Sequence, residues 1–223
     1  MPPGTKIFDP SWVFSHLPSI GERIVQHLQL TIVPLALGIV ISLVLAIIAI
    51  RRPVTYGPVT AITGLLYTIP SLAAFALLRP IFGLSLLTAI IPLTTYTLLI
   101  LFRNFTAGFN AVPAEILEAA EGMGYTRRQR LLRVELPLAV PLIIAGIRLA
   151  SVTTIGLATV AAVLGDAFGG LGQLITEGIQ GFFPTKYLLG AALSVLLAFA
   201  ADVLFVRLER VITPWSRARA GAR

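Results

Sequence analysis

Residues 118–137 read EAAEGMGYTRRQRLLRVELP, a charged, helix-forming segment with two glycines that lies between long apolar runs. A segment with this density of charge cannot be buried in hydrocarbon. It must therefore lie in water if the flanking runs cross a bilayer. The whole chain is 57% hydrophobic and only 12% charged, whereas soluble domains have about 25% charged residues. The composition thus predicts an integral membrane protein of one compact domain.

Five apolar runs are long enough to cross about 30 Å of hydrocarbon. They cover residues 28–50, 58–78, 84–102, 138–164 and 186–206. All are rich in Leu, Ile, Ala and Val, and none alternates in the way that a barrel strand does. We therefore predict an all-α integral membrane protein with about five transmembrane helices.

Basic residues predict which ends of these helices face the cytoplasm. Arginines cluster after the first, third and fifth runs, and the opposite side carries few basic residues. By the positive-inside rule, the N-terminus lies outside and the C-terminus and residues 118–137 lie in the cytoplasm. The chain then divides into an extracytoplasmic or interfacial segment (1–27), a transmembrane domain (28–206) and a cytoplasmic basic tail (207–223). Between the last two runs, the glycine-rich stretch 166–184 predicts a short helix and turn at the outer mouth.

The net charge and the residue types exclude several function classes. A formal charge of +7 suggests nucleic acid in a soluble chain. Here the arginines flank apolar runs and fit anionic lipid and a phosphate-handling partner, so no nucleic-acid partner is expected. With no cysteine and two histidines, neither a disulfide framework nor a Cys- or His-based metal site is expected. No GxxxxGK[ST] phosphate loop is present, so the chain is not expected to hydrolyse ATP or to bind a cofactor itself.

The charged segment itself predicts two short helices. The first begins near Pro113 and presents one apolar face, which comprises Ile116, Ala119, Ala120 and Met123. Gly124 is suited to a left-handed cap at its end. Thr126 and Gln129 have the spacing of a capping box for a second helix, which runs to Pro137. Two such helices joined to a membrane helix can convert a push on the cytoplasmic side into a tilt of that helix.

The spacing of this segment also resembles a known motif. Glu118-Ala119-Ala120 is followed after three residues by Gly124 and then, after nine more, by Val134-Glu135-Leu136-Pro137. This pattern resembles the EAA loop of ABC-importer permeases of the type I, MetI-like family, here within residues 113–137. The resemblance implies that six residues couple the chain to ATPase subunits: Glu118, Ala119, Ala120, Gly124, Leu136 and Pro137.

Further stretches are similar to the osmoprotectant branch of these permeases, which take up glycine betaine, choline and carnitine. They are His27–Leu30, Tyr67–Leu72, Arg133–Ala139, Ala145–Arg148 and Gly169–Gly172. The resemblance implies a second permease subunit, identical or homologous, and two cytoplasmic ATPases that bind ATP and Mg²⁺. It also implies a separate extracytoplasmic substrate-binding protein and a place in a bacterial or archaeal cytoplasmic membrane.

Polar residues inside the runs are candidates for the pathway or its gate. Arg148 and Asp202 lie in the fourth and fifth runs and are expected to form an ion pair or to line a cavity. Thr68, Ser71 and Thr153 either face the pathway or bond to backbone within their helices.

Two alternatives stay open from sequence. One is an importer permease for another small solute such as an amino acid. The other is an ion-coupled secondary carrier, which requires an inverted repeat or a chain of midplane carboxylates.

Overall fold

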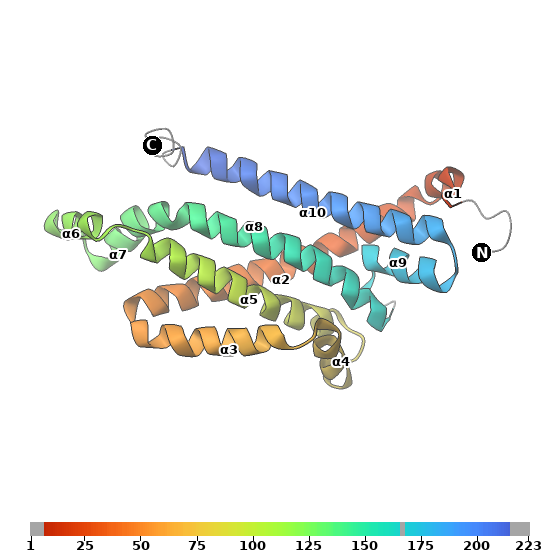
Figure 1. Cartoon of the computed structure of the whole chain (residues 1–223), viewed down its shortest axis with the longest axis horizontal. Coiled ribbons are helices and arrows are strands. Elements are labelled where there is room, and N and C mark those ends of the chain that lie inside the picture. The colour runs from red at the N-terminus through yellow and green to blue at the C-terminus, as the bar shows by residue number, and fades with distance from the viewer. Residues whose placement is uncertain (1–6, 166–167, 215–223) are drawn as a thin grey trace.

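The computed structural model describes residues 7–165 and 168–214, and within them every regular element is a helix (Figure 1). Four helices are long and apolar enough to cross a membrane, and a fifth crossing results if one bent pair is counted. The long helices are α2 (Leu17–Arg51), α5 (Leu86–Asn110), α8 (Leu136–Ala161) and α10 (Pro184–Ile212). The predicted all-α membrane fold is confirmed.

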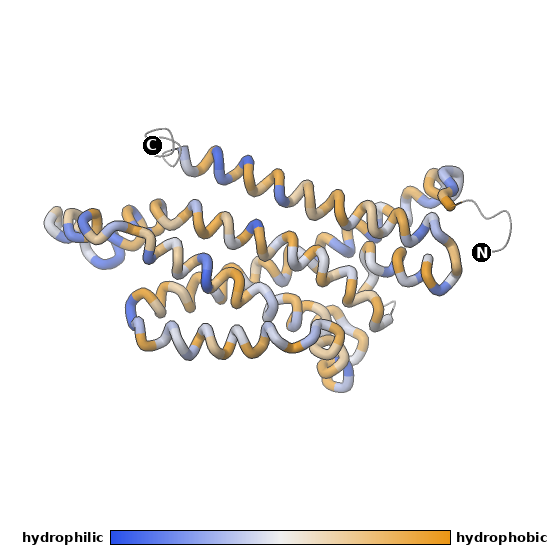
Figure 2. The backbone as a smooth tube through the Cα atoms, in the orientation of Figure 1, coloured by the Kyte–Doolittle hydropathy of each residue, from blue (hydrophilic) through white to orange (hydrophobic). Residues whose placement is uncertain are grey.

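The shorter elements join these helices or cap their ends. They are α1 (Pro10–Ser15), η1 (Pro53–Thr55), α3 (Tyr56–Thr68), α4 (Ser71–Phe82), α6 (Ala114–Gly122), α7 (Arg127–Arg130), η2 (Leu131–Glu135), η3 (Ala162–Leu164) and α9 (Leu171–Gln180). Helices α6 and α7 lie at one end of the bundle, and α1 and α9 lie at the other (Figure 1). Apolar residues run along the middle of the long helices, and hydrophilic residues gather at the two ends (Figure 2).

Helices α2, α5 and α8 form the centre of the bundle, and small residues allow their close approach. A Cβ atom at Gly38 would collide with the side chain of Thr97 across the α2–α5 contact. A Cβ atom at Gly146 of α8 would likewise collide with the Asn104 side chain of α5. Membrane helices associate through such packing because lipid supplies no hydrophobic driving force between them.

The second predicted span, 58–78, is not a continuous helix. Helices α3 and α4 meet at 90°, at Ile69 and Pro70. Ile69 is extended, with ψ of 126°, as the residue before a proline prefers. The hydroxyl of Tyr96 donates a hydrogen bond of 2.6 Å to the Ile69 carbonyl, which satisfies a group that the break leaves free.

Other helix boundaries also differ from the apolar runs. Helix α2 begins at Leu17, so it passes without interruption through the predicted boundary at residue 27. Helix α9 provides the helix that was predicted within 166–184; Asp166 and Ala167 lie outside the described residues. Most of the predicted tail, from residue 215, also lies outside them.

Candidate functional site

The first helix of the charged segment, α6, ends in a Schellman motif. The Tyr125 N–H donates to the Ala120 carbonyl over 3.1 Å, and the Gly124 N–H donates to the Glu121 carbonyl over 2.9 Å. Gly124 has a φ of +78°, as this motif requires. The predicted left-handed cap is therefore confirmed, with Pro113 at the N-cap rather than inside the helix.

The second helix, α7, begins with the predicted capping box. The Gln129 N–H donates to the Thr126 hydroxyl over 3.3 Å, and the Thr126 N–H donates to the Gln129 side-chain oxygen over 2.9 Å. Helix α7 then continues through the π-helical turn η2 into α8. Leu136 and Pro137 lie in the first turn of α8, so residues 127–161 form one continuous helical rod.

The predicted apolar face of α6 is partly buried inside this chain and partly exposed. Ala120 is 1% exposed and packs inside the chain. Ala119 lies on the exposed side with Glu118, and Met123 is 68% exposed. Within this chain, Glu118, Ala119 and Met123 are therefore free to contact a partner, whereas Ala120 holds α6 to its own subunit.

An ion cluster that sequence reasoning missed fixes α6 against the rod. The Arg130 Nε donates to Glu135 over 2.7 Å, and the same guanidinium pairs with Glu121 of α6. Arg130 and Glu135 are five residues apart, a spacing that places side chains on different faces of an α-helix. The π turn between them has an i to i+5 repeat, so it brings them together. We call Glu121, Arg130 and Glu135 the bracket.

The charged residues inside the fourth and fifth spans meet as predicted. Arg148 of α8 donates two hydrogen bonds to the Asp202 carboxylate of α10, one from each of two guanidinium nitrogens, and that between Nη2 and Oδ2 is 3.0 Å. The two side chains are 42% and 31% exposed from this chain. The pair fastens α10, of which little is otherwise buried in the bundle.

The three hydroxyl residues are satisfied locally or lie near the helix break. The Thr68 hydroxyl donates to the Leu65 carbonyl over 2.7 Å, and the Thr153 hydroxyl donates to the Leu149 carbonyl over 2.9 Å. Ser71 is half-buried at the first position of α4. Two of the three hydroxyls thus bond backbone within their own helix, which is one of the two roles expected from sequence.

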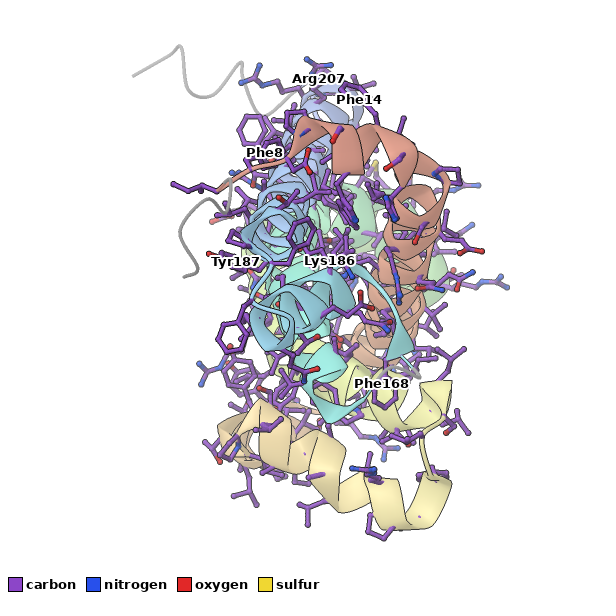
Figure 3. The ribbon with its side chains drawn as sticks, turned by 90° about the vertical axis from the view of Figure 1, so that its right-hand side faces the viewer. Phe8, Phe14, Phe168, Lys186, Tyr187 and Arg207 are labelled. Carbon is purple, nitrogen blue, oxygen red and sulfur yellow. The ribbon has the colours of Figure 1, made fainter. Side chains whose placement is uncertain are left out.

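A second charge cluster joins α2, α9 and α10 at the opposite end of the bundle. Glu177 accepts from Arg23 over 3.1 Å and from Lys186 over 2.8 Å. Figure 3 looks onto this end and labels Lys186, whose ammonium also lies 5.6 Å from the centre of the Trp12 ring. Sequence reasoning did not pair these residues. Arg23 is 154 residues from Glu177, whereas Lys186 is only nine residues from it but belongs to a different helix.

His27 is fully buried next to this cluster and links three helices. Its Nε2 lies 3.2 Å from the Ile155 carbonyl, and its Nδ1 lies 3.4 Å from the Leu171 N–H. These partners assign the proton to Nε2, since a carbonyl accepts and an N–H donates. The far ends of α2, α8 and α9 are therefore held as one unit. Within the described residues, no group of three His, Cys, Asp or Glu side chains is placed to hold a metal ion.

The chain is similar to known transport proteins over most of its length. The family model described as "Binding-protein-dependent transport system inner membrane component" matches residues 19–214. The chain belongs to this family. It is 39% identical over 194 residues to the osmoprotectant import permease protein OsmW of Salmonella typhimurium. This match covers 85% of this chain and 89% of that protein. It is 35% identical over 190 residues to the glycine betaine/carnitine/choline permease protein OpuCB of Bacillus subtilis, covering 85% and 86%.

Solved structures agree with this assignment. The chain is similar to a permease chain of the MetNI methionine ABC transporter in an inward-facing conformation, with a TM-score of 0.79 and 25% identity. That match covers 89% of this chain and 98% of the other. The chain is thus an integral membrane permease of the ABC-importer class, and the ion-coupled carrier is not favoured.

Proposed function

We propose that this chain is the translocating subunit of an ATP-driven importer for quaternary-amine osmoprotectants such as glycine betaine, choline and carnitine. The names of its relatives support this solute class. The observation that carries the coupling role is the outward face of α6. Glu118 and Ala119 are exposed there, on a helix that ends in the cap at Gly124 and that the bracket joins to α7.

The mechanism follows from this connection. An ATPase subunit that moves α6 also moves the bracket, because Glu121 belongs to α6 and Arg130 belongs to α7. Helix α7 continues into α8, which begins at Leu136 and Pro137, so the displacement becomes a tilt of the transmembrane rod. ATP and Mg²⁺ bind to the ATPase partner, which carries out hydrolysis, and this chain itself holds no cofactor.

Two further partners complete the importer. An extracytoplasmic binding protein delivers the solute, and a second permease subunit, identical or homologous, covers part of the exposed apolar surface. Helix α10 illustrates that surface, since Val195, Leu196 and Phe199 are all at least 60% exposed in this chain. Arg148 and Asp202 fasten α10 to α8 beside the pathway, and Thr68, Ser71 and Thr153 supply polar positions along it.

The permease lies in a bacterial or archaeal cytoplasmic membrane with the N-terminus outside and the C-terminus and α6 in the cytoplasm. Single cysteines at Gln129 and Gln180 test this orientation. Both positions are exposed, and they belong to α7 and α9, which lie at opposite ends of the bundle (Figure 1). An impermeant maleimide added to intact cells should label the cysteine at position 180 only. Labelling of the cysteine at position 129 instead would reverse the orientation.

Reconstituted transport tests the function. The chain is assembled with its ATPase and binding protein in vesicles, and uptake of radiolabelled glycine betaine, choline, carnitine and methionine is compared. We expect accumulation of at least one of the three amines and none of methionine. Accumulation of methionine alone would identify an importer for another solute.

A charge reversal on the outward face of α6 tests coupling in the same system. Glu118→Lys should leave the amount of protein in the membrane unchanged while abolishing uptake and weakening ATPase retention. Glu22→Lys is the control, since Glu22 is an exposed glutamate at the other end of the bundle, and it should transport normally. Normal uptake by Glu118→Lys with the ATPase attached would contradict the coupling role.

A further inference from the structure

A cavity of about 670 Å³ lies next to residues 113–137, which we call the coupling segment. Its walls come from the ends of α2 and α5 and from α6 and α7. Apolar side chains form part of the wall, among them Ile50, Phe109 and Leu131. This volume is in the range that holds a small organic ligand.

The cavity has an excess of positive charge. Four arginines line it against two glutamates. The glutamates, Glu121 and Glu135, are both bound by Arg130 in the bracket. The guanidinium groups of the other three arginines, Arg51, Arg52 and Arg127, form no ion pair or hydrogen bond with any residue in 7–165 or 168–214. Three guanidinium groups therefore face a cavity that supplies no anion for them.

We propose that this cavity binds a phosphate-bearing anion. Guanidinium groups bind phosphate oxygens through paired N–H donors, and several together select phosphate over a neutral ligand. Arg51 is the last residue of the transmembrane helix α2 and Arg52 is its C-cap, and the end of a membrane helix lies at the depth of the lipid headgroups. Basic pockets at this depth suit anionic headgroups, and the apolar part of the wall suits the glycerol and the first methylenes. A free phosphate compound offers the same chemistry from the aqueous side.

The cavity and the outward face of α6 are distinct surfaces. Leu117 and Glu121 of α6 line the cavity and are one helical turn apart, so they share a face. Glu118 and Ala119 are exposed on another side of the same helix. An anion in the cavity thus leaves the ATPase-facing surface free.

The placement of the arginines gives the anion a structural effect. Arg51 and Arg52 belong to the end of α2, whereas Arg127 begins α7. A phosphate group bound by all three holds the coupling segment against the membrane helices. This effect does not depend on which solute is transported.

The test compares two triple variants of the full-length chain that remove equal charge. The cavity variant is Arg51→Gln, Arg52→Gln and Arg127→Gln. The control variant is Arg103→Gln, Arg128→Gln and Arg207→Gln, three exposed arginines outside the cavity. Retained phosphatidylglycerol and phosphatidylcholine are measured by native mass spectrometry, and the melting temperature is followed on titration with either lipid or with inorganic phosphate.

Each basic residue beside an anionic headgroup contributes about a fivefold factor in affinity. The cavity variant should therefore bind roughly 100-fold more weakly than wild type, and the control variant should differ by less than tenfold. A shift with phosphatidylglycerol alone identifies a lipid headgroup, and a shift with inorganic phosphate identifies a free anion. Equal retention by the two variants, or no shift of wild type with either probe, would overturn the proposal. So would a cavity variant that binds anions normally but no longer retains the ATPase subunit, since the arginines would then contact that protein.

Discussion

Replacing Gly124 by alanine tests the coupling segment without removing any contact. A Cβ atom at Gly124 would meet no other atom within 4 Å, so the substitution causes no collision. The φ of +78° is the only source of cost. A residue with a Cβ in the left-handed region costs about 1–2 kcal/mol, and relief of that strain breaks the two Schellman hydrogen bonds to Ala120 and Glu121.

Either outcome lowers the population of the conformation of α6 and α7 that we propose binds the ATPase subunit. One to two kcal/mol corresponds to roughly a 5- to 30-fold change in an equilibrium. We expect the affinity of the ATPase subunit for Gly124→Ala to fall by this factor when the full chain is embedded in nanodiscs. Gly124→Asn should lose less, because asparagine tolerates the left-handed region better.

Gly122 provides the matched control. It is exposed, and a Cβ atom there would also meet nothing within 4 Å, but it lies in α6 without a positive φ. Gly122→Ala should leave ATPase affinity unchanged and raise helix stability by up to about 1 kcal/mol. Equal losses in Gly122→Ala and Gly124→Ala would show that any added methyl group disturbs the interface. Wild-type affinity in Gly124→Ala would refute the role of the left-handed cap.

Two further predictions concern the packing of the bundle. Arg148→Leu or Asp202→Leu alone should lower the melting temperature of the bilayer-embedded chain, because each leaves the other charge without its partner. The double variant should recover most of the loss. A coupling energy near zero in this double-mutant cycle would contradict an interaction between the two residues. Gly172→Ala should destabilise the chain by about 1–3 kcal/mol through overpacking, since its Cβ would collide with the α8 backbone at position 159. Gly156→Ala in α8 meets nothing within 4 Å and should leave the melting temperature within a few degrees, so equal shifts would refute the packing argument.

The sequence predicted the features that depend on local chemistry. Hydrophobic runs located the long helices, and the cap at Gly124 and the capping box at Thr126 were confirmed. Such features are predictable because the residues that form them lie within a few positions of one another.

Features that depend on tertiary contacts were missed. Pro34 and Pro92 lie inside continuous helices, whereas the helix breaks before Pro70. The proline alone therefore does not decide the outcome. What distinguishes the break is its partner, since the hydroxyl that binds the Ile69 carbonyl comes from Tyr96.

The candidate site shows the same division. The bracket requires a π-helical turn between Arg130 and Glu135, and no local residue pattern predicts that turn. The cavity requires the last residues of α2 and α5 to lie beside the start of α7, which follows only from the packed bundle. Neither was predictable from the order of residues along one segment.

The continuous rod also gives the number of residues between Arg127 and Pro137 a structural consequence. Residues from Arg127 to Ala161 form one helical body, and only Tyr125 and Thr126 separate its first residue from the cap at Gly124. One residue inserted between Arg127 and Pro137 would turn α6 by about 100° around the axis of α8 and displace it by about 1.5 Å. Glu118 would then face away from the ATPase subunit that we propose it contacts, even though every residue of the motif was retained. The number of helical residues before Pro137 therefore sets the direction in which α6 points around the axis of α8. Insertions or deletions between Arg127 and Pro137 should be less tolerated than substitutions.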